Sequence, residues 1–247
     1  QHTMNTNKNS YVIIYAAVMV ILAAVLLAGA NILLKPAQEE NASIDKMEQI
    51  LRALGKTAPK AEVISTYKEL IKQELLVNAE GQVVKTFEGD QVGSSEAFNA
   101  NTELDYKLIA KGEKRDLPVF VAEVDGKKLY VFPLNGAGLW NKIWGYLAVD
   151  AADHSTIEGA DFGNAGETPG LGAEISTPRF ANQFKGKQLF REGAFTGIAV
   201  VKAGQKSDTQ DYVDGISGGT LTSVGVHDML HHSLAPFQKF LETSNAQ

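Results

Sequence analysis

The sequence lacks cysteine entirely across its 247 residues. This absence excludes disulfide bonds, thiolate metal sites and cysteine-held iron–sulfur clusters. The chain also lacks a basic stripe, and its formal net charge is −6. Nucleic acid is therefore not expected as a partner. No internal repeat or low-complexity segment divides the chain, whose length suits one domain of fair size with an appendage.

A complete hydrolase signature is also missing. Residues 215–219 read Gly-Ile-Ser-Gly-Gly, which fits the G-x-S-x-G pattern around a nucleophilic serine. That pattern needs a hydrophobic strand before the serine and an acid and a histidine well downstream. Here the preceding residues are polar, and Asp228 and His231 crowd onto one expected helix. We therefore expect Ser217 to have no nucleophilic role.

Metal and dinucleotide signatures are incomplete in the same way. His227 and His231 are four residues apart, but Asp228 stands where a zinc protease motif requires glutamate, and a third ligand is absent from the spacing. Residues 136–141 begin like a dinucleotide fingerprint and end in asparagine, without a strand–helix unit around them. We expect no catalytic residue, no metal site and no NADH site in this chain.

One long apolar run is present near the N-terminus. Residues 11–34 carry no charged side chain, and as a helix they span roughly 36 Å, enough to cross a bilayer. A signal peptide is the alternative, but its apolar core is only about 7–15 residues long and needs a cleavage site of small residues. The run therefore predicts a single transmembrane anchor. Positive charges flank both of its ends, so the positive-inside rule does not fix the orientation.

The remaining residues alternate helical and strand patterns. Helices are expected over 43–54, 62–77, 177–184 and 224–241, and residues 88–116 are expected to form a loop-rich insertion. Strands are expected over 118–124, 127–134, 143–149, 155–162 and 196–202. Asp125-Gly126 between the first two strands is a strong hairpin signal. This mixture predicts an α+β domain of antiparallel strands and helices behind the anchor.

Two glycine-rich turns could lie against a flat ligand. Residues 167–172 read Glu-Thr-Pro-Gly-Leu-Gly, and residues 136–140 read Gly-Ala-Gly-Leu-Trp. The first specifies a tight turn, and the second places an aromatic side chain after a flexible backbone. The first could instead simply connect two strands, and the tryptophan of the second could instead be a core residue. An aromatic ring system would need such apolar neighbours above and below it.

The most informative segment is residues 214–223, which read Asp-Gly-Ile-Ser-Gly-Gly-Thr-Leu-Thr-Ser directly before an expected helix. Unpaired N–H groups at a helix N-terminus, with glycines that allow close approach, suit a phosphate. Thr222 and Ser223 could add hydroxyl donors. A threonine at this point, Thr220, could also carry the phosphate covalently.

These residues resemble the C subunit of the bacterial sodium-translocating NADH:quinone reductase, within the wider FMN-binding domain family. Segment 214–220 is similar to that family's flavinylation motif, Asp-x-x-Ser/Thr-Gly-Ala-Thr, in which a flavin transferase joins FMN to the last threonine by a phosphoester. Asp214, Ser217, Gly218 and Thr220 match the motif, and Gly219 replaces its usual alanine. The family often has histidine where this chain has Asn164, so that residue's role is not carried over.

The resemblance implies covalent FMN on Thr220 and a flavin ring over the 167–172 turn, with Leu171 and Trp140 as candidates for its two faces. The other cofactor-binding residues that it implies are Asp214, Ser217, Gly218, Gly219, Leu221, Thr222, Ser223, Glu167, Thr168, Gly170, Gly172 and Leu139. The expected parts are an N-terminal tail over residues 1–10, the transmembrane helix over 11–34, a helical connecting region over 35–90 and the FMN-binding domain over 91–247.

The implied function is electron relay within a membrane complex that oxidises NADH, reduces ubiquinone and exports Na⁺, in which this chain is not catalytic alone. The implied partners are the other subunits of that complex, the flavin transferase during maturation, and membrane lipid. The implied location is the bacterial inner membrane, with a single pass and the FMN domain on the periplasmic side. The G subunit of the related Rnf electron-transport complex is the nearest alternative. A non-redox, membrane-anchored assembly protein is the alternative of another class.

Overall fold

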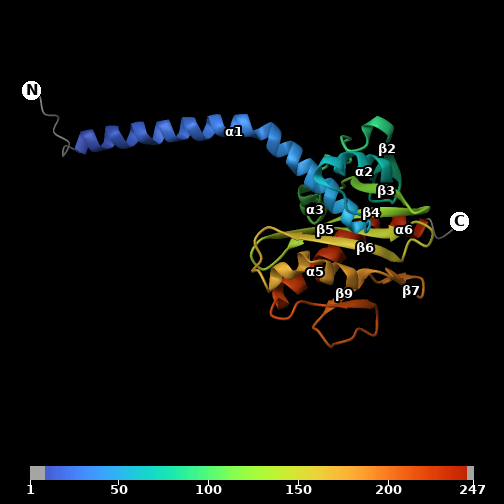
Figure 1. The fold of residues 1–247 in the computed structure, drawn as a ribbon. Helices are drawn as coiled ribbons and strands as arrows, with labels where there is room; N and C mark the ends of the chain where they lie inside the picture. Colours follow the sequence, from blue (N-terminus) through green and yellow to red (C-terminus); the bar gives the residue numbers. More distant parts are fainter. Residues whose placement is uncertain (1–8, 244–247) are drawn as a thin grey trace, which may run out of the picture. The chain divides into compact units, whose positions relative to one another are not determined.

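The computed structural model describes residues 9–243 (Figure 1). They form two compact units, one through Asp45 and the other from Lys46 onward. Most of the expected tail, residues 1–8, lies outside the described residues.

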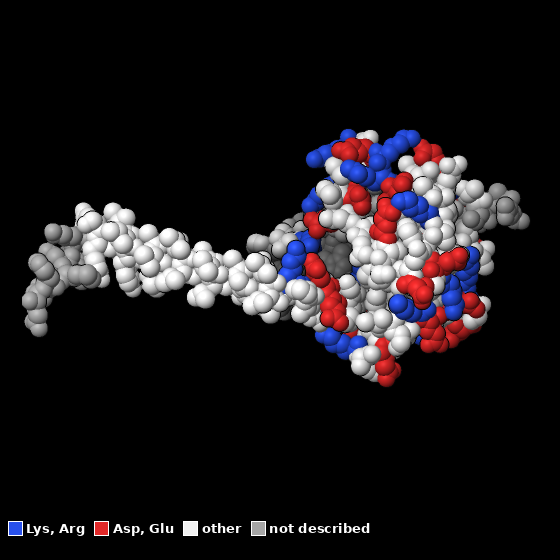
Figure 2. Space-filling model, turned by 90° about the horizontal axis from the view of Figure 1, so that it is seen from above, with Lys and Arg blue, Asp and Glu red and all other residues white. Residues whose placement is uncertain are grey.

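The first unit consists of helix α1, Asn9–Ala53, up to Asp45. Among residues 9–243 this is the helix that is long and apolar enough, by length and composition, to cross a membrane. Its large apolar side chains between residues 12 and 34 are exposed, and Figure 2 shows that stretch without acidic or basic side chains. The helices expected over 11–34 and 43–54 are one continuous helix, which contains Pro36.

The second unit is built on a six-stranded antiparallel sheet with the strand order β2-β1-β3-β4-β5-β6. Its strands are β1 (Ile71–Val77), β2 (Val83–Glu88), β3 (Leu117–Val124), β4 (Lys127–Ala137), β5 (Lys142–Asp150) and β6 (Ile157–Asn164). A parallel pair, β9 (Ile198–Val201) and β10 (Asp211–Asp214), and a short hairpin, β7 (Phe190–Arg191) and β8 (Ala194–Phe195), form two small sheets.

The predicted α+β fold class is confirmed, and its hairpin lies at the expected turn. Asp125 and Gly126 both have positive φ, 52° and 78°, which matches the turn that suits the twist of two antiparallel strands. Along β4 and β5, alternate residues such as Phe132, Leu134 and Leu147 point into one apolar core. The pleat therefore explains which side chains of each strand are buried together.

Helices cover both faces of the sheet (Figure 1). The central one is α5, Thr220–Leu234, which packs Val226, Met229 and Leu230 into the core against β4 and β5. The short helices on the C-terminal half are η3 (Gly172–Ser176), α4 (Pro178–Ala181), η4 (Asn182–Phe184), η5 (Ala235–Phe237) and α6 (Gln238–Thr243). The other face carries the end of α1, which is joined to the sheet by Gln49–Trp144 and Arg52–Asp161 contacts.

The helix expected over 62–77 is wrong in its second half. After η1 (Lys60–Glu62), α2 covers Val63–Leu70 and then gives way to strand β1. Residues 74–77 are all buried because β1 lies between β2 and β3 and is covered on both faces. Apolar residues at 70, 71 and 75 fit a helical period as well as a doubly covered strand, and the tertiary pairing decided between them.

The expected loop over 88–116 contains two helices, η2 (Gly89–Gln91) and α3 (Thr102–Ile109). Asn101 caps α3, because its side-chain oxygen accepts a hydrogen bond from the N–H of Leu104 at 3.1 Å. Tyr106 then ties α3 to the core by donating to the carbonyls of Pro133 and Ser233. A cap residue before a weakly periodic segment was the signal for this helix.

Candidate functional site

Thr220 is the first residue of α5 and is exposed. The helix was expected to begin near residue 224 and begins four residues earlier. Gly219 precedes it and offers no side-chain cap, and the first turn contains no acidic residue. The first-turn N–H groups of a helix lack partners within the helix and carry its positive dipole end. The surroundings of Thr220 therefore suit a phosphate.

The loop before α5 is held in one shape by main-chain contacts. Strand β10 leads into it, and the N–H of Gly215 donates to the carbonyl of Val201 at 2.7 Å. Gly218 has a φ of +75°, a region that glycine adopts without steric cost. Asp214 accepts at 3.3 Å from the N–H of Gly204, so its side chain orders the neighbouring loop.

The hydroxyls of Thr222 and Ser223 are used inside the protein. Thr222 donates to Glu167 Oε2 at 2.5 Å, and Ser223 donates to the carbonyl of Gly219 at 2.9 Å. Ser223 Oγ also accepts from the N–H of Ile216 at 2.8 Å. Both side chains are buried. They fix the start of the helix and the loop, rather than point outward as the phosphate donors expected from the sequence.

The 167–172 turn lies beside this helix start. The carbonyl of Thr168 accepts from the N–H groups of Leu171 and Ala173, both at 3.1 Å, and Gly170 has a φ of +75°. A Cβ on Gly218 would lie 2.8 Å from Leu171 Cδ2, so the leucine side chain packs directly over that glycine. Two segments that are far apart in the sequence therefore meet at one place.

Glu167 joins the two glycine-rich turns to the helix. It is 5% exposed, and its Oε1 accepts from the N–H groups of Trp140, at 2.9 Å, and Asn141, at 3.4 Å. Its other oxygen accepts from Thr222 on α5. The structure thus brings together the segments that the sequence singled out separately, 136–141, 167–172 and 214–223.

Apolar side chains are exposed around this junction. Trp140 is 69% exposed and Leu171 is 41% exposed. The other large apolar side chains exposed on these segments are Leu139 and Leu221, and Val224, the next residue of α5, is also exposed. Exposed apolar groups gathered near an uncapped helix start provide surface for a flat, partly apolar ligand that ends in a phosphate. The residues present fit FMN in this respect.

The segments that carry the competing motifs form turns and packing contacts. Residues 136–138 end strand β4 and turn back into β5, with the N–H of Gly138 donating to the carbonyl of Asn141 at 2.8 Å, so they form a hairpin rather than a strand–helix dinucleotide site. His227 Nδ1 accepts from the N–H of Val200 at 3.3 Å, and its ring lies 4.7 Å from that of His231. These histidines pack α5 against β9, and residues 9–243 contain no cluster of three or more potential metal ligands.

Ser217 does follow a strand, β10, although its preceding residues are polar. Within the described part of the chain no hydrogen bond links it to a histidine or a carboxylate. It is exposed on the loop, in keeping with a role in the motif rather than as a nucleophile.

Sequence reasoning missed two contributors to the site. Asn164 accepts from the N–H of Glu167 at 3.0 Å and donates to Ser176 Oγ at 2.9 Å, which orders the turn before the carboxylate. Gly225 lets α5 approach β4, since a Cβ there would lie 2.3 Å from the carbonyl oxygen of Ala137. For Asn164, the available signal in the sequence was an asparagine three residues before the glutamate, a spacing that suits an Asx turn.

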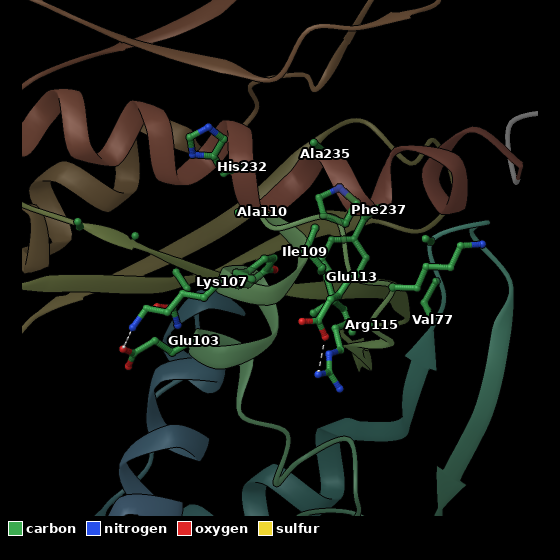
Figure 3. A pocket seen from close by; sticks show the side chains of 18 of the residues that line it. Val77, Glu103, Lys107, Ile109, Ala110, Glu113, Arg115, His232, Ala235 and Phe237 are labelled. Atoms are coloured by element: carbon green, nitrogen blue, oxygen red, sulfur yellow. Dashed lines mark hydrogen bonds and ion pairs between the residues drawn. The ribbon is translucent and has the colours of Figure 1, made fainter.

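A hollow of about 790 Å³ lies between α3, the end of β4 and η5 (Figure 3). Its apolar wall includes Ile109 and Phe237. Its charged side chains pair with one another, as in the contact of 2.7 Å between Lys107 and Glu103. This hollow shares the 136–141 hairpin with the site but none of the residues of 167–172 or 214–223.

The chain is similar to known proteins over most of its length. Residues 138–235 match the FMN-binding domain family. The C subunit of the Na(+)-translocating NADH-quinone reductase of Neisseria meningitidis is 32% identical, with 92% of each chain covered, and that of Haemophilus ducreyi is 30% identical, with 90% of this chain and 88% of that one covered.

Two crystal structures agree in fold. The C subunit of the same reductase from Parabacteroides distasonis has a TM-score of 0.72 and 47% identity, covering 84% of this chain and 96% of that one. Shewanella oneidensis NqrC has a TM-score of 0.62 and 30% identity, covering 84% of this chain and all of that one. With an N-terminal apolar helix, an FMN-binding domain and these relatives, the chain belongs to the NqrC family, the C subunits of Na(+)-translocating NADH-quinone reductases.

Proposed function

We propose that the chain carries FMN as a phosphoester on Thr220 and relays electrons within a membrane complex that oxidises NADH, reduces ubiquinone and exports Na⁺. The observation that supports this most directly is the position of Thr220, exposed at the uncapped start of α5 beside exposed apolar side chains of two other segments. Its match to the flavinylation motif supports the covalent bond.

Bound FMN supplies the redox chemistry, since its ring accepts and gives up electrons singly or in pairs. The chain's residues position it. The start of α5 holds the phosphate by backbone N–H groups and its dipole. Leu171 and Trp140 offer apolar surface for the ring, and Gly170, Gly172, Gly218 and Gly219 keep the backbone close. No acid or base of this chain acts on a substrate in this proposal, and the chain is not catalytic without its partners.

We also propose where the chain lies and which proteins it contacts. Residues 11–34 anchor the chain in the lipid of the bacterial inner membrane as a single pass, and the FMN domain lies on the periplasmic side. The other subunits of the complex exchange electrons with it, and a flavin transferase attaches the cofactor. The four relatives named above are all C subunits of the quinone reductase, which favours this complex over the Rnf complex.

Mass spectrometry of the full-length chain tests the attachment. Co-expression with the flavin transferase should raise the mass by one FMN less one water, with the added mass on the peptide that contains Thr220. Thr220→Ala should abolish the gain. Thr209→Ala, in the exposed loop before β10, is the matched control and should keep it. A Thr220→Ala chain that still bears covalent FMN would falsify the assignment. A purified chain without flavin absorption would instead favour the non-redox anchor.

A further inference from the structure

The carboxylate of Glu167 connects parts of the chain that are far apart in sequence. Its nearest donors are the N–H groups of Trp140 and Asn141 on the β4–β5 hairpin and the hydroxyl of Thr222 on α5. These donors lie 26 to 55 residues from Glu167 in sequence. Its own N–H donates to Asn164, so the glutamate is held from both ends.

Two glycines leave room for this carboxylate. A Cβ on Gly138 would lie 2.5 Å from Glu167 Oε1, and a Cβ on Gly172 would lie 2.6 Å from Oε2 and 2.4 Å from Thr222 Oγ1. Cβ atoms essentially never come so close to other heavy atoms. Any larger residue at either position would therefore push the carboxylate away from its donors.

Glu167 is ionised at neutral pH although it is buried. Burial opposes ionisation, but the hydrogen bonds from Thr222 and from the N–H groups of Trp140, Asn141 and Leu139 outweigh it and lower the pKa of the carboxyl. All of these donors are neutral groups, so they leave the negative charge of the carboxylate in place.

We propose that Glu167 is a positioning residue, a latch that holds the Leu139–Trp140 turn against the first turn of α5, and that its fixed negative charge lowers the reduction potential of the flavin. This inference rests on the proposed FMN site at Thr220. In it Glu167 does not bind the cofactor directly. It fixes the two segments between which the ring lies, and its charge disfavours the added electron density of the reduced ring.

Three variants separate the effect of the geometry from the effect of the charge. Glu167→Gln keeps the shape, because the amide oxygen can accept the hairpin N–H groups and the amide NH₂ can donate to Thr222 Oγ1. Glu167→Ala removes the latch. Thr222→Val removes only the α5 donor and retains the side-chain shape, which provides a milder break where Glu167→Ala folds poorly.

The first measurement needs no flavin. Trp140 and Trp144 are the two tryptophans of the chain, so Trp144→Phe leaves Trp140 as a single reporter. In the detergent-solubilised, full-length apo chain, Glu167→Ala and Thr222→Val should lower the fluorescence anisotropy of Trp140, and Glu167→Gln should not. Adding Thr222→Val to Glu167→Ala should change the anisotropy little further, because the contact with Thr222 is already lost. Unchanged anisotropy in the Glu167→Ala chain would overturn the latch.

The second measurement uses the flavinylated chain. Glu167→Gln should keep covalent FMN at the level of the unchanged protein and shift the midpoint potential upward, since a negative charge has been removed. Glu123→Gln, an exposed carboxylate on β3, is the control and should leave the potential unchanged. An identical potential in the Glu167→Gln chain would overturn the electrostatic part. Failure of the FMN site itself would appear separately, as an unmodified Thr220 in the unchanged protein. The anisotropy measurement, which needs no flavin, would still test the latch in that case.

Discussion

Glu74 and Glu167 are the most completely buried glutamates in the described part of the chain, and their surroundings differ. Glu74, on β1, accepts from the Tyr67 hydroxyl at 2.7 Å, from Ser95 Oγ at 2.5 Å and from the N–H of Gly93 at 2.9 Å. Lys46 lies near enough to interact electrostatically with it. The side-chain hydroxyls of Tyr67 and Ser95 therefore provide most of its hydrogen bonds, with the partly buried Lys46 nearby.

Glu167 has a different kind of partner. Backbone N–H groups and one hydroxyl surround it, glycines make the space, and the exposed Trp140 carries one of those N–H groups. The two hydroxyls that donate to Glu74 belong to side chains that are themselves buried. The carboxylate of Glu167 accepts from backbone N–H groups and so orders an exposed hairpin turn. Two glutamates of similar burial can therefore differ in role: one stabilises the fold, and the other shapes the surface of the candidate site. Point substitutions test this difference.

The largest loss of stability is expected for Glu74→Ala. It leaves the buried hydroxyls of Tyr67 and Ser95 and the N–H of Gly93 without their acceptor, and each buried donor left unsatisfied costs about 1–3 kcal/mol in the free energy of unfolding. Denaturant unfolding of the detergent-solubilised chain measures it. Glu96→Ala, which removes an exposed partner of Lys85, should cost under about 1 kcal/mol. A loss of similar size in both variants would contradict the structural role of Glu74.

Raising the pH should stabilise the protein through Lys46. Burial lowers the pKa of Lys46 from 10.5 to about 8, partly countered by Glu74. The unfolded chain then binds more protons than the folded one above pH 8, so stability rises with pH from about 8 toward 10.5 and is level below that window. The gain is on the order of 1–3 kcal/mol.

Unfolding free energies between about pH 7 and 9.5 measure this effect, before tyrosines of the unfolded chain ionise. Lys46→Met should flatten the rise. If the unfolding free energy of this variant rises with pH as steeply as that of the unchanged protein, the shift in the pKa of Lys46 is not coupled to folding.

Gly172→Ala should weaken the Glu167 region by about 1–3 kcal/mol, as overpacking does. It should also lower the yield of covalent FMN, because the new Cβ displaces Glu167 and Thr222. Gly166→Ala is the matched control: its Cβ would meet only Asn141 Cβ, at 3.9 Å. Equal flavin yield and equal stability in both variants would argue against the glycine cradle.

A smaller loss of stability is expected for Arg52→Ala. Arg52 makes two hydrogen bonds to Asp161, at 2.9 and 3.0 Å, but its side chain is 43% exposed. Solvent screening limits the loss to about 1 kcal/mol. Burial raises the pKa of Asp161 despite Arg52, so protonation can relieve part of the cost. Lys56→Ala, which removes a partner of exposed Asp125, should change stability less still. If Arg52→Ala lowers the free energy of unfolding as much as Glu74→Ala does, the exposure of a side chain does not determine how large the loss of stability is.

Local signals in the sequence predicted part of this molecule. The Asp125-Gly126 turn predicted the β3–β4 hairpin, and the run over 11–34 predicted a membrane-length helix. The start of α5 was placed late because Thr222 and Ser223 have low helix propensity in isolation. Their hydroxyls bond to Glu167 and Gly219 and so stabilise the earlier start.

The remaining features depend on contacts between distant residues. Nothing local distinguishes Ile71–Val77 as a strand until β2 and β3 cover it. The roles of Glu167 and Glu74 depend on partners up to 55 and 21 residues away, respectively. The sequence therefore identified the segments of the candidate site, but the carboxylate that joins them became visible only in the folded chain.

The exposure of Thr220 has a consequence for the order of maturation. Gly219, Thr222 and Ser223 are buried around it, whereas Ser217, Gly218, Thr220 and Leu221 are exposed or partly exposed. Under the proposed function, the flavin transferase can therefore reach the Thr220 hydroxyl on a domain that has already folded. Within this segment it meets a short surface epitope whose shape is set by the buried residues beneath it. Folding would then act as a quality check, since a misfolded chain would not display that epitope to the enzyme.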